Sequence, residues 1–203
     1  MNDDILSLID NLKQNGFHVE FYKNVTEVKK TILGKIDMNE TIGIGGSMTI
    51  FDMNIYNDLK ERGNVVYWHW MVPDNMKNEE RAKASHSDVY LSSTNAITLD
   101  GKLVNIDGAG NRVSSMFYGH KKVFIVAGIN KLCKDYDEAI KRIKSIACPK
   151  NAERLKLNTP CRFTGKCNDC SSPDRMCNVE VIMHKRPKNI DICIYIVGEN
   201  LGY

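Results

Sequence analysis

Apolar and polar positions alternate with two different periods along the first half of the chain. Ile5, Leu8 and Leu12 fall at the spacing of an amphipathic helix over residues 3–15. Asn24 stands where a helix cap belongs, directly before a second helical pattern. The same reasoning predicts strands over residues 18–22, 41–44, 64–70 and 88–91, and helices over residues 24–35, 48–62 and 78–84.

The second half continues this alternation and adds a hairpin. Residues 96–107 read as two short strands joined across Asp100 and Gly101, a dipeptide that favours a type I′ turn. A buried strand over 123–127, a helix over 136–147 and a last strand over 191–197 follow, and the last strand is apolar on both faces, as central parallel strands are. These elements predict a single domain over residues 1–203, an α/β fold whose open, mostly parallel sheet is flanked by helices and carries an inserted antiparallel hairpin.

Composition and charge exclude several classes of protein. Apolar residues make up 42% of the 203 residues and charged residues 26%, which is typical of a folded globular protein. The longest apolar run, residues 123–127, is far too short to span a bilayer, and the first residues lack the basic and apolar regions of a signal peptide. We therefore expect a cytoplasmic protein. A net charge of +3 without clustered cations argues against nucleic-acid binding.

A glycine-rich loop follows the strand predicted at residues 41–44. Open parallel sheets bind ligands beyond the carboxyl ends of their strands, and glycines let an anion approach the backbone there. Gly45, Gly46, Ser47 and Thr49 are therefore candidate ligand-binding residues. The alternative interpretation is a tight turn in which Ser47 only caps the next helix.

Two further polar segments flank the predicted hairpin and could line the same cleft. The candidate residues are Asn95, Thr98, Asp107, Asn111 and Arg112. Arg112 could bind a carboxylate or phosphate, and Asp107 could act as a base or hydrogen-bond acceptor. The alternative is that residues 107–112 form a loop selected for its backbone angles, with Arg112 in a surface ion pair.

Four of the seven cysteines gather in a loop over residues 158–178. Cys161, Cys167, Cys170 and Cys177 have the spacing C-x5-C-x2-C-x6-C. Soft thiolates at such short spacing suit an iron-sulfur cluster or structural zinc. A redox-active dithiol and thiols without a shared role are the other interpretations. Cys148, before Pro149 at the predicted helix end, could replace one ligand if the fold brings it close.

Taken in order, several segments resemble one known family. They are TIGIGGSMT, STNAITLDGKLVNIDGAGNR, VFIVAGINK, AIKRIKSIACPKNAERL and TPCRFTGKCNDCSSPDRMCN, and together they resemble the LUD domain, named for lactate utilisation, over about residues 40–197. The resemblance implies a fold like that of the NagB, ribose-phosphate isomerase and coenzyme A transferase group. Clefts in that group commonly receive phosphorylated sugars, coenzyme A or folate derivatives, which favours the anion-binding interpretation of the glycine loop.

The resemblance also links the chain to electron transfer, because some LUD-domain proteins serve a bacterial L-lactate oxidation system with iron-sulfur subunits. We therefore expect a cytoplasmic redox or metabolic protein of lactate or organic-acid utilisation. It would bind an anionic metabolite at the glycine loop and a 4Fe-4S iron-sulfur cluster at the cysteine loop, with electron-transfer subunits as partners. The aromatic residues Tyr67, Trp68 and Trp70 belong either to the core or to a subunit interface, and exposed aromatics would favour a homodimer. The alternative is a non-catalytic binding or assembly module with structural zinc or no metal.

Overall fold

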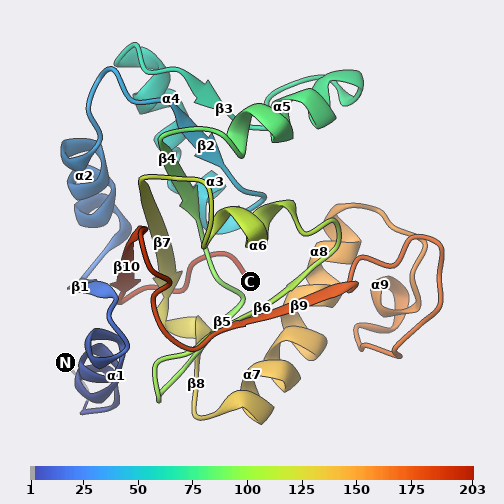
Figure 1. Cartoon of the computed structure of the whole chain (residues 1–203). Coiled ribbons are helices and arrows are strands. Elements are labelled where there is room, and N and C mark those ends of the chain that lie inside the picture. Colours follow the sequence, from blue (N-terminus) through green and yellow to red (C-terminus); the bar gives the residue numbers. More distant parts are fainter. Residues whose placement is uncertain (1–2) are drawn as a thin grey trace.

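A six-stranded parallel sheet forms the core of the computed structural model, which describes residues 3–203 (Figure 1). In spatial order its strands are β1 (His18–Tyr22), β10 (Asp191–Val197), β7 (Lys122–Gly128), β4 (Val89–Ser92), β2 (Ile42–Ile44) and β3 (Val66–Tyr67). Every neighbouring pair is parallel. β10 lies inside the sheet between β1 and β7, as its two apolar faces predict.

Helices cover both faces of this sheet, and alternate side chains of β7 pack against the helices on opposite faces. Val123 and Ile125 pack with α1 (Asp3–Gln14) in one core cluster. Phe124 and Val126 pack in a second cluster with α2 (Val25–Lys35), α3 (Met48–Asp52) and α4 (Ile55–Glu61). Side chains alternate across a strand, so a strand buried on both faces is apolar at every position.

The hairpin belongs to a separate sheet. This second sheet has the order β8 (Leu132–Cys133), β5 (Ala96–Thr98), β6 (Leu103–Asp107) and β9 (Val179–Met183). The sequence pattern predicted β5 and β6 but neither β8 nor β9. Ile97, Leu103 and Met183 join the same core cluster as α1, so the second sheet covers part of one face of the main sheet.

The turn between β5 and β6 is not the predicted type I′ turn. A type I′ turn needs positive φ at both central residues, but only Gly101 has one, at 82°. The amide of Gly101 donates to the carbonyl of Thr98 at 2.8 Å, which gives a three-residue loop in which glycine occupies the left-handed position. The end of α1 packs on this loop, where Asn15 donates to the carbonyls of Asp100 and Gly101.

The helix expected over residues 48–62 is broken. Asn54 adopts a left-handed conformation with φ 51° between α3 and α4, a region that asparagine tolerates better than most residues. In one straight helix, Ile50 and Leu59 would point about 180° apart, since each residue turns about 100°. The break lets both side chains be fully buried in the same core.

The helix expected over residues 136–147 continues further. α7 (Tyr136–Arg142) passes through a π-helical segment η3 (Ile143–Ala147) into α8 (Cys148–Arg154). Pro149 lacks an amide hydrogen and would clash with the preceding turn of a regular α-helix. The wider π segment directly before it accommodates the proline, so the chain stays helical to Arg154.

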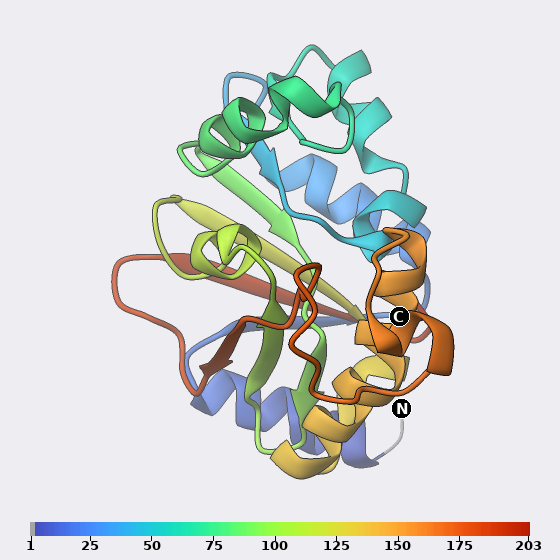
Figure 2. The same ribbon diagram turned by 90° about the vertical axis from the view of Figure 1, so that its right-hand side faces the viewer.

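The remaining elements are short. They are η1 (Asp74–Met76), α5 (Lys77–Ala84), α6 (Asn111–Ser115), η2 (Ile129–Lys131) and α9 (Pro160–Thr164). The strand expected over residues 64–70 is only β3, after which the chain turns at Trp68. α8, α9 and the cysteine-rich loop lie together at one side of the molecule (Figure 2). Within the described part of the chain, no helix has the length and apolar character needed to cross a membrane.

Candidate functional site

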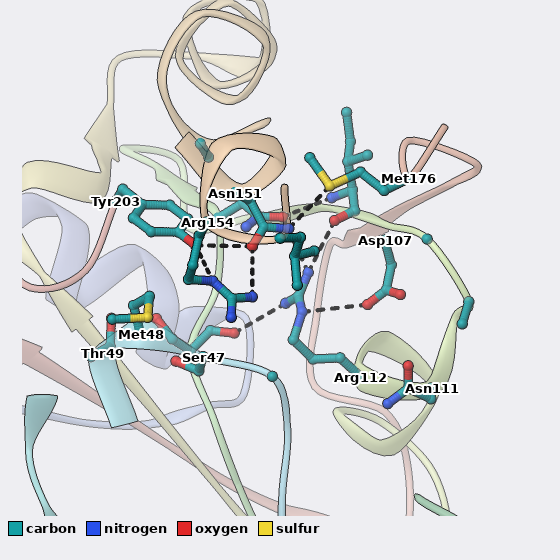
Figure 3. A pocket seen from close by; sticks show the side chains of 18 of the residues that line it. Ser47, Met48, Thr49, Asp107, Asn111, Arg112, Asn151, Arg154, Met176 and Tyr203 are labelled. Carbon is teal, nitrogen blue, oxygen red and sulfur yellow. Dashed lines mark hydrogen bonds and ion pairs between the residues drawn. The ribbon is translucent and has the colours of Figure 1, made fainter. Parts of the chain in front are cut away.

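A cavity of about 530 Å³ opens at the carboxyl edge of the main sheet. Its walls include the segments that directly follow β2, β3, β4 and β7, together with α8. Figure 3 shows residues of two of these walls, Ser47 and Thr49 after β2 and Asn151 and Arg154 in α8. Ligand sites in open parallel sheets form at this edge, as expected from the sequence. We call this cavity the cleft.

The glycine loop forms one wall of the cleft. Gly46, Ser47 and Thr49 line it, whereas Gly45 lies behind the wall. A Cβ atom on Gly45 would come within 2.7 Å of the hydroxyl of Tyr90 and 3.1 Å of Arg112, so this glycine allows close packing under the cleft. Ser47 caps α3 by accepting a hydrogen bond from the amide of Ile50 at 3.3 Å. Ser47 therefore both caps α3 and lines the cleft.

Arg112 is buried and bound to the protein on every side. Its terminal nitrogens donate to the side chains of Asn105 at 2.7 Å and Asn95 at 3.1 Å, and to the carbonyls of Ser93 and Ile106 at 3.2 and 3.1 Å. Its Nε lies 3.4 Å from Asp107. All three guanidinium nitrogens are therefore engaged, and Arg112 ties the segment before β5 to the end of β6 rather than forming a surface ion pair.

Most of the other candidate residues also reach the cleft. Asn95, Asp107 and Asn111 line it together with Arg112. Asp107 accepts a hydrogen bond from the amide of Gly110 at 2.8 Å, which shapes the loop before α6. Thr98 does not line the cleft, because its hydroxyl donates to Asp100 at the hairpin loop.

The opposite wall contains an arginine that the sequence reasoning missed. In α8, Arg154 donates to the hydroxyl of Tyr203 and to the side chain of Asn151, both at 2.9 Å (Figure 3). Its guanidinium also stacks on the ring of Trp70, 4.3 Å from the ring centre. These contacts hold the guanidinium at the cleft, and they depend on α8 continuing past Pro149.

A buried lysine was also missed. Lys131 follows β7 in η2 and is only 3% exposed. Its amine donates to the hydroxyls of Thr49 at 2.9 Å and Ser93 at 2.8 Å. Burial lowers the pKa of Lys131 to about 7, and the positive charges of Arg142 and Arg112 contribute. The signal in the sequence was a lysine just beyond the carboxyl end of a buried parallel strand.

The cleft is strongly cationic. Five basic residues line it (Lys77, Arg81, Arg112, Lys131 and Arg154), against a single carboxylate, Asp107. Within residues 3–203, neither Arg81, Lys131 nor Arg154 forms an ion pair with a carboxylate. His69 adds no charge at neutral pH, because burial and the neighbouring cations lower its pKa to about 4. The cleft is therefore suited to an anion.

The four cysteines of the loop line a second, smaller cavity. Cys161 lies in α9, and Cys167, Cys170 and Cys177 follow in the irregular part of the loop. All four are free thiols. Among the described residues, however, no three histidine, cysteine or acidic side chains are arranged closely enough to hold a metal ion. The donor set suits a thiophilic metal, and binding one would require the loop to tighten around it.

Cys148 joins this group from α8. Its sulfur lies 3.4 Å from that of Cys177, and the two thiols share a hydrogen bond. This hydrogen bond lowers the pKa of Cys177 to about 7, with help from Arg175, and raises the pKa of Cys148. Cys148 also lines the cleft, and Met176 lines both cavities. The cysteine cavity and the cleft are therefore direct neighbours.

Two comparisons with known proteins test the family expected from the sequence. The sequence matches the LUD domain over residues 5–197. This chain belongs to the LUD domain family. The family is associated with lactate utilisation. A comparison with curated proteins finds no match.

One solved structure has a fold similar to that of this LUD domain. The crystal structure of a DUF162 family protein from Deinococcus radiodurans superposes with a TM-score of 0.53 at 9% identity, over 97% of both chains. At this identity the likeness shows the fold alone. The expected family and the expected α/β fold are thereby confirmed.

The aromatic cluster of this LUD domain is packed inside the protein. Trp68 is 1% exposed and stacks on Trp70, with 5.4 Å between the ring centres. Trp70 lines the cleft and carries Arg154 on its face. The cluster therefore forms part of the core and of the cleft wall. The homodimer stays a prediction, and these aromatic residues no longer support it.

Proposed function

We propose that this LUD domain binds a small anionic metabolite of lactate or organic-acid utilisation in the cleft. The observation that carries the proposal is the charge of the cleft wall, where five basic residues, four of them cationic even with Lys131 uncharged, face one carboxylate. Among the described residues Arg81 and Arg154 have no carboxylate partner, whereas Lys77 pairs with Asp74 and Arg112 with Asp107, so an anion in the cleft would supply the missing counter-charge. The volume of about 530 Å³ lies within the range typical of small-molecule sites, roughly 300–1,000 Å³.

The cations of the cleft divide into two groups with different roles. Arg112 donates its hydrogen bonds to protein oxygens and thereby holds the cleft wall together. Arg154 has only neutral partners, namely Tyr203, Asn151 and the face of Trp70, which orient its guanidinium without neutralising it. Arginine binds carboxylates and phosphates in a two-pronged geometry, so Arg154 is the residue that we assign to the anionic group of the ligand.

Calorimetric titration tests this assignment. L-lactate, pyruvate, inorganic phosphate, a sugar phosphate and coenzyme A would be titrated into the wild type, Arg154→Ala and Arg154→Lys. A charge-assisted bond is worth about 1.5–3 kcal/mol, so Arg154→Ala should weaken binding by about 10–150-fold, and lysine should restore only part of it. Lys150→Ala is the matched control, because it removes an exposed cation from the same helix outside the cleft. Equal affinities for wild type and Arg154→Ala would contradict the assignment.

We further propose that Cys161, Cys167, Cys170 and Cys177 bind an iron-sulfur cluster, with zinc as the alternative occupant. Their shared cavity and the soft donor set support a metal, and Cys148 is close enough to Cys177 to take the place of one of the four. A cluster would add one-electron redox chemistry beside the anion site, whereas zinc would only stabilise the loop. The redox role, and with it electron-transfer partners, depends on which metal binds.

Anaerobic purification followed by iron, zinc and sulfide analysis separates these cases. Iron with acid-labile sulfide and a brown colour, both lost in Cys167→Ser and Cys170→Ser, would support the cluster. Cys193→Ser is the control, because Cys193 lies in β10, away from the loop. Zinc alone would leave a binding module with a structural metal, and a metal-free protein would refute the metal site while leaving the anion site untouched.

A further inference from the structure

The amine of Lys131 is held at the cleft in a fixed position by two neutral groups. It lies between the hydroxyls of Thr49 and Ser93, which come from the glycine loop and from the segment after β4. All three residues line the cleft. No carboxylate in the described part of the chain forms an ion pair with this amine. Such surroundings position the nitrogen but provide no carboxylate to pair with a positive charge on it.

The two hydroxyls act as hydrogen-bond acceptors for the amine. The hydroxyl of Thr49 donates its own hydrogen to the carbonyl of Leu201, and that of Ser93 donates to the carbonyl of Thr94, both at 3.3 Å. Each oxygen is therefore left as an acceptor for Lys131. A neutral primary amine has two N–H bonds and one lone pair. With both N–H bonds used by the hydroxyls, the lone pair remains for a group in the cleft.

Charged groups on three neighbouring elements act on the amine. Arg112 from α6 and Arg142 from α7 disfavour the ammonium form, and Asp52 from α3 favours it. Burial, the largest effect, also disfavours the charge. Lysines become nucleophiles when burial and neighbouring cations remove their proton near neutral pH.

We propose that Lys131 forms an imine with the ligand of the cleft, which is then a small anion that carries an aldehyde or ketone group. The amine nitrogen attacks the carbonyl carbon and forms a C–N bond. The carbonyl oxygen takes one hydrogen from the amine and one proton from solvent water in the cleft and leaves as water, so that a C=N bond remains whose nitrogen keeps the second amine hydrogen and the positive charge. This inference rests on the proposed anion site, with Arg154 and the other cleft cations receiving the carboxylate or phosphate.

Reductive trapping tests the proposal on the whole protein. Pyruvate and glyoxylate, the simplest anions with a ketone or aldehyde, would be incubated with the protein and sodium cyanoborohydride. Intact mass should then show a single reduced adduct, which peptide mapping assigns to Lys131. Lys131→Arg should abolish it, and Lys134→Arg, an exposed lysine three residues further on, should not. Acetate, which has no ketone or aldehyde, should give no adduct but should compete.

A second variant keeps the test informative if Lys131→Arg disturbs the fold. Thr49→Val and Ser93→Ala leave the lysine in place but remove one acceptor each, and should slow trapping about tenfold, because the amine is no longer oriented. Adducts spread over exposed lysines, or unchanged in Lys131→Arg, would overturn the proposal. Anion binding without any adduct would overturn the imine alone, whereas a cleft that binds no anion would refute the proposed function as well.

Discussion

Replacing Arg112 with methionine should destabilise the fold strongly, because the side chain is part of the architecture of the cleft. Arg112 and Asp107 are only 8% and 9% exposed, and they lie 3.4 Å apart. The substitution keeps most of the apolar stem but removes the charge and four hydrogen bonds to protein oxygens. It leaves the carboxylate of Asp107 buried without its cation.

The magnitude follows from these contacts. Four hydrogen bonds from a charged group, at about 1.5 kcal/mol each, would sum to about 6 kcal/mol, but bonds that share one side chain are not additive. Breaking a buried ion pair by removing one partner costs about 3–5 kcal/mol, and we take this range. With a urea m-value of about 2.5 kcal/mol/M, a loss of ~4 kcal/mol lowers the unfolding midpoint by about 1.6 M.

Urea unfolding followed by circular dichroism measures this shift. Lys83→Met is the control, because it breaks only the exposed pair with Glu79 and should leave the midpoint close to that of the wild type. A folded Arg112→Met protein with a wild-type midpoint but no anion binding would refute the reasoning. In that case Arg112 would serve the ligand directly, and its protein contacts would contribute little.

Two further predictions concern other parts of the fold. Asn24→Ala should cost about 1 kcal/mol in urea unfolding, because Asn24 caps α2 by accepting from the amide of Glu27 at 3.0 Å; Asn24→Ser should recover most of the loss, and equal midpoints for both would contradict the cap. Hydrogen bonds from Lys121 and Thr41 lower the pKa of Asp88, so its contribution to stability is fully present above the unfolded pKa of 3.8 and is lost as the pH falls below it. Asp88→Asn should therefore lower the midpoint at pH 7 and flatten its acid limb, and an acid limb as steep as that of the wild type would show that other carboxylates control it.

Much of the fold was predictable because local patterns coincide with the tertiary structure. The helices α1 and α2, the buried strands β7 and β10 and the cap at Ser47 were read from spacing alone. In each case one short segment contains the whole signal, either an apolar face or a capping side chain next to an amide. The family motifs then indicated the fold group into which these elements assemble.

The sequence did not predict those elements whose conformation depends on contacts between residues distant in the chain. The break at Asn54 depends on burying Ile50 and Leu59 in one core, and the helix through Pro149 depends on a π segment that no local pattern indicates. β9 becomes a strand by pairing with β6, more than 70 residues earlier in the chain. Whether a segment such as β9 forms a strand depends on the strand that it pairs with more than on its own residues.

The sequence by itself determined an α/β domain of the LUD family with a polar, glycine-rich edge. Only the tertiary structure decided what that edge contains. It engaged the guanidinium of Arg112 with protein oxygens, brought Arg154 and Lys131 to the cleft, and set Cys148 beside Cys177. The physical reason is that charge and reactivity at a site depend on burial and on neighbours distant in sequence, and neither can be read from spacing along the chain.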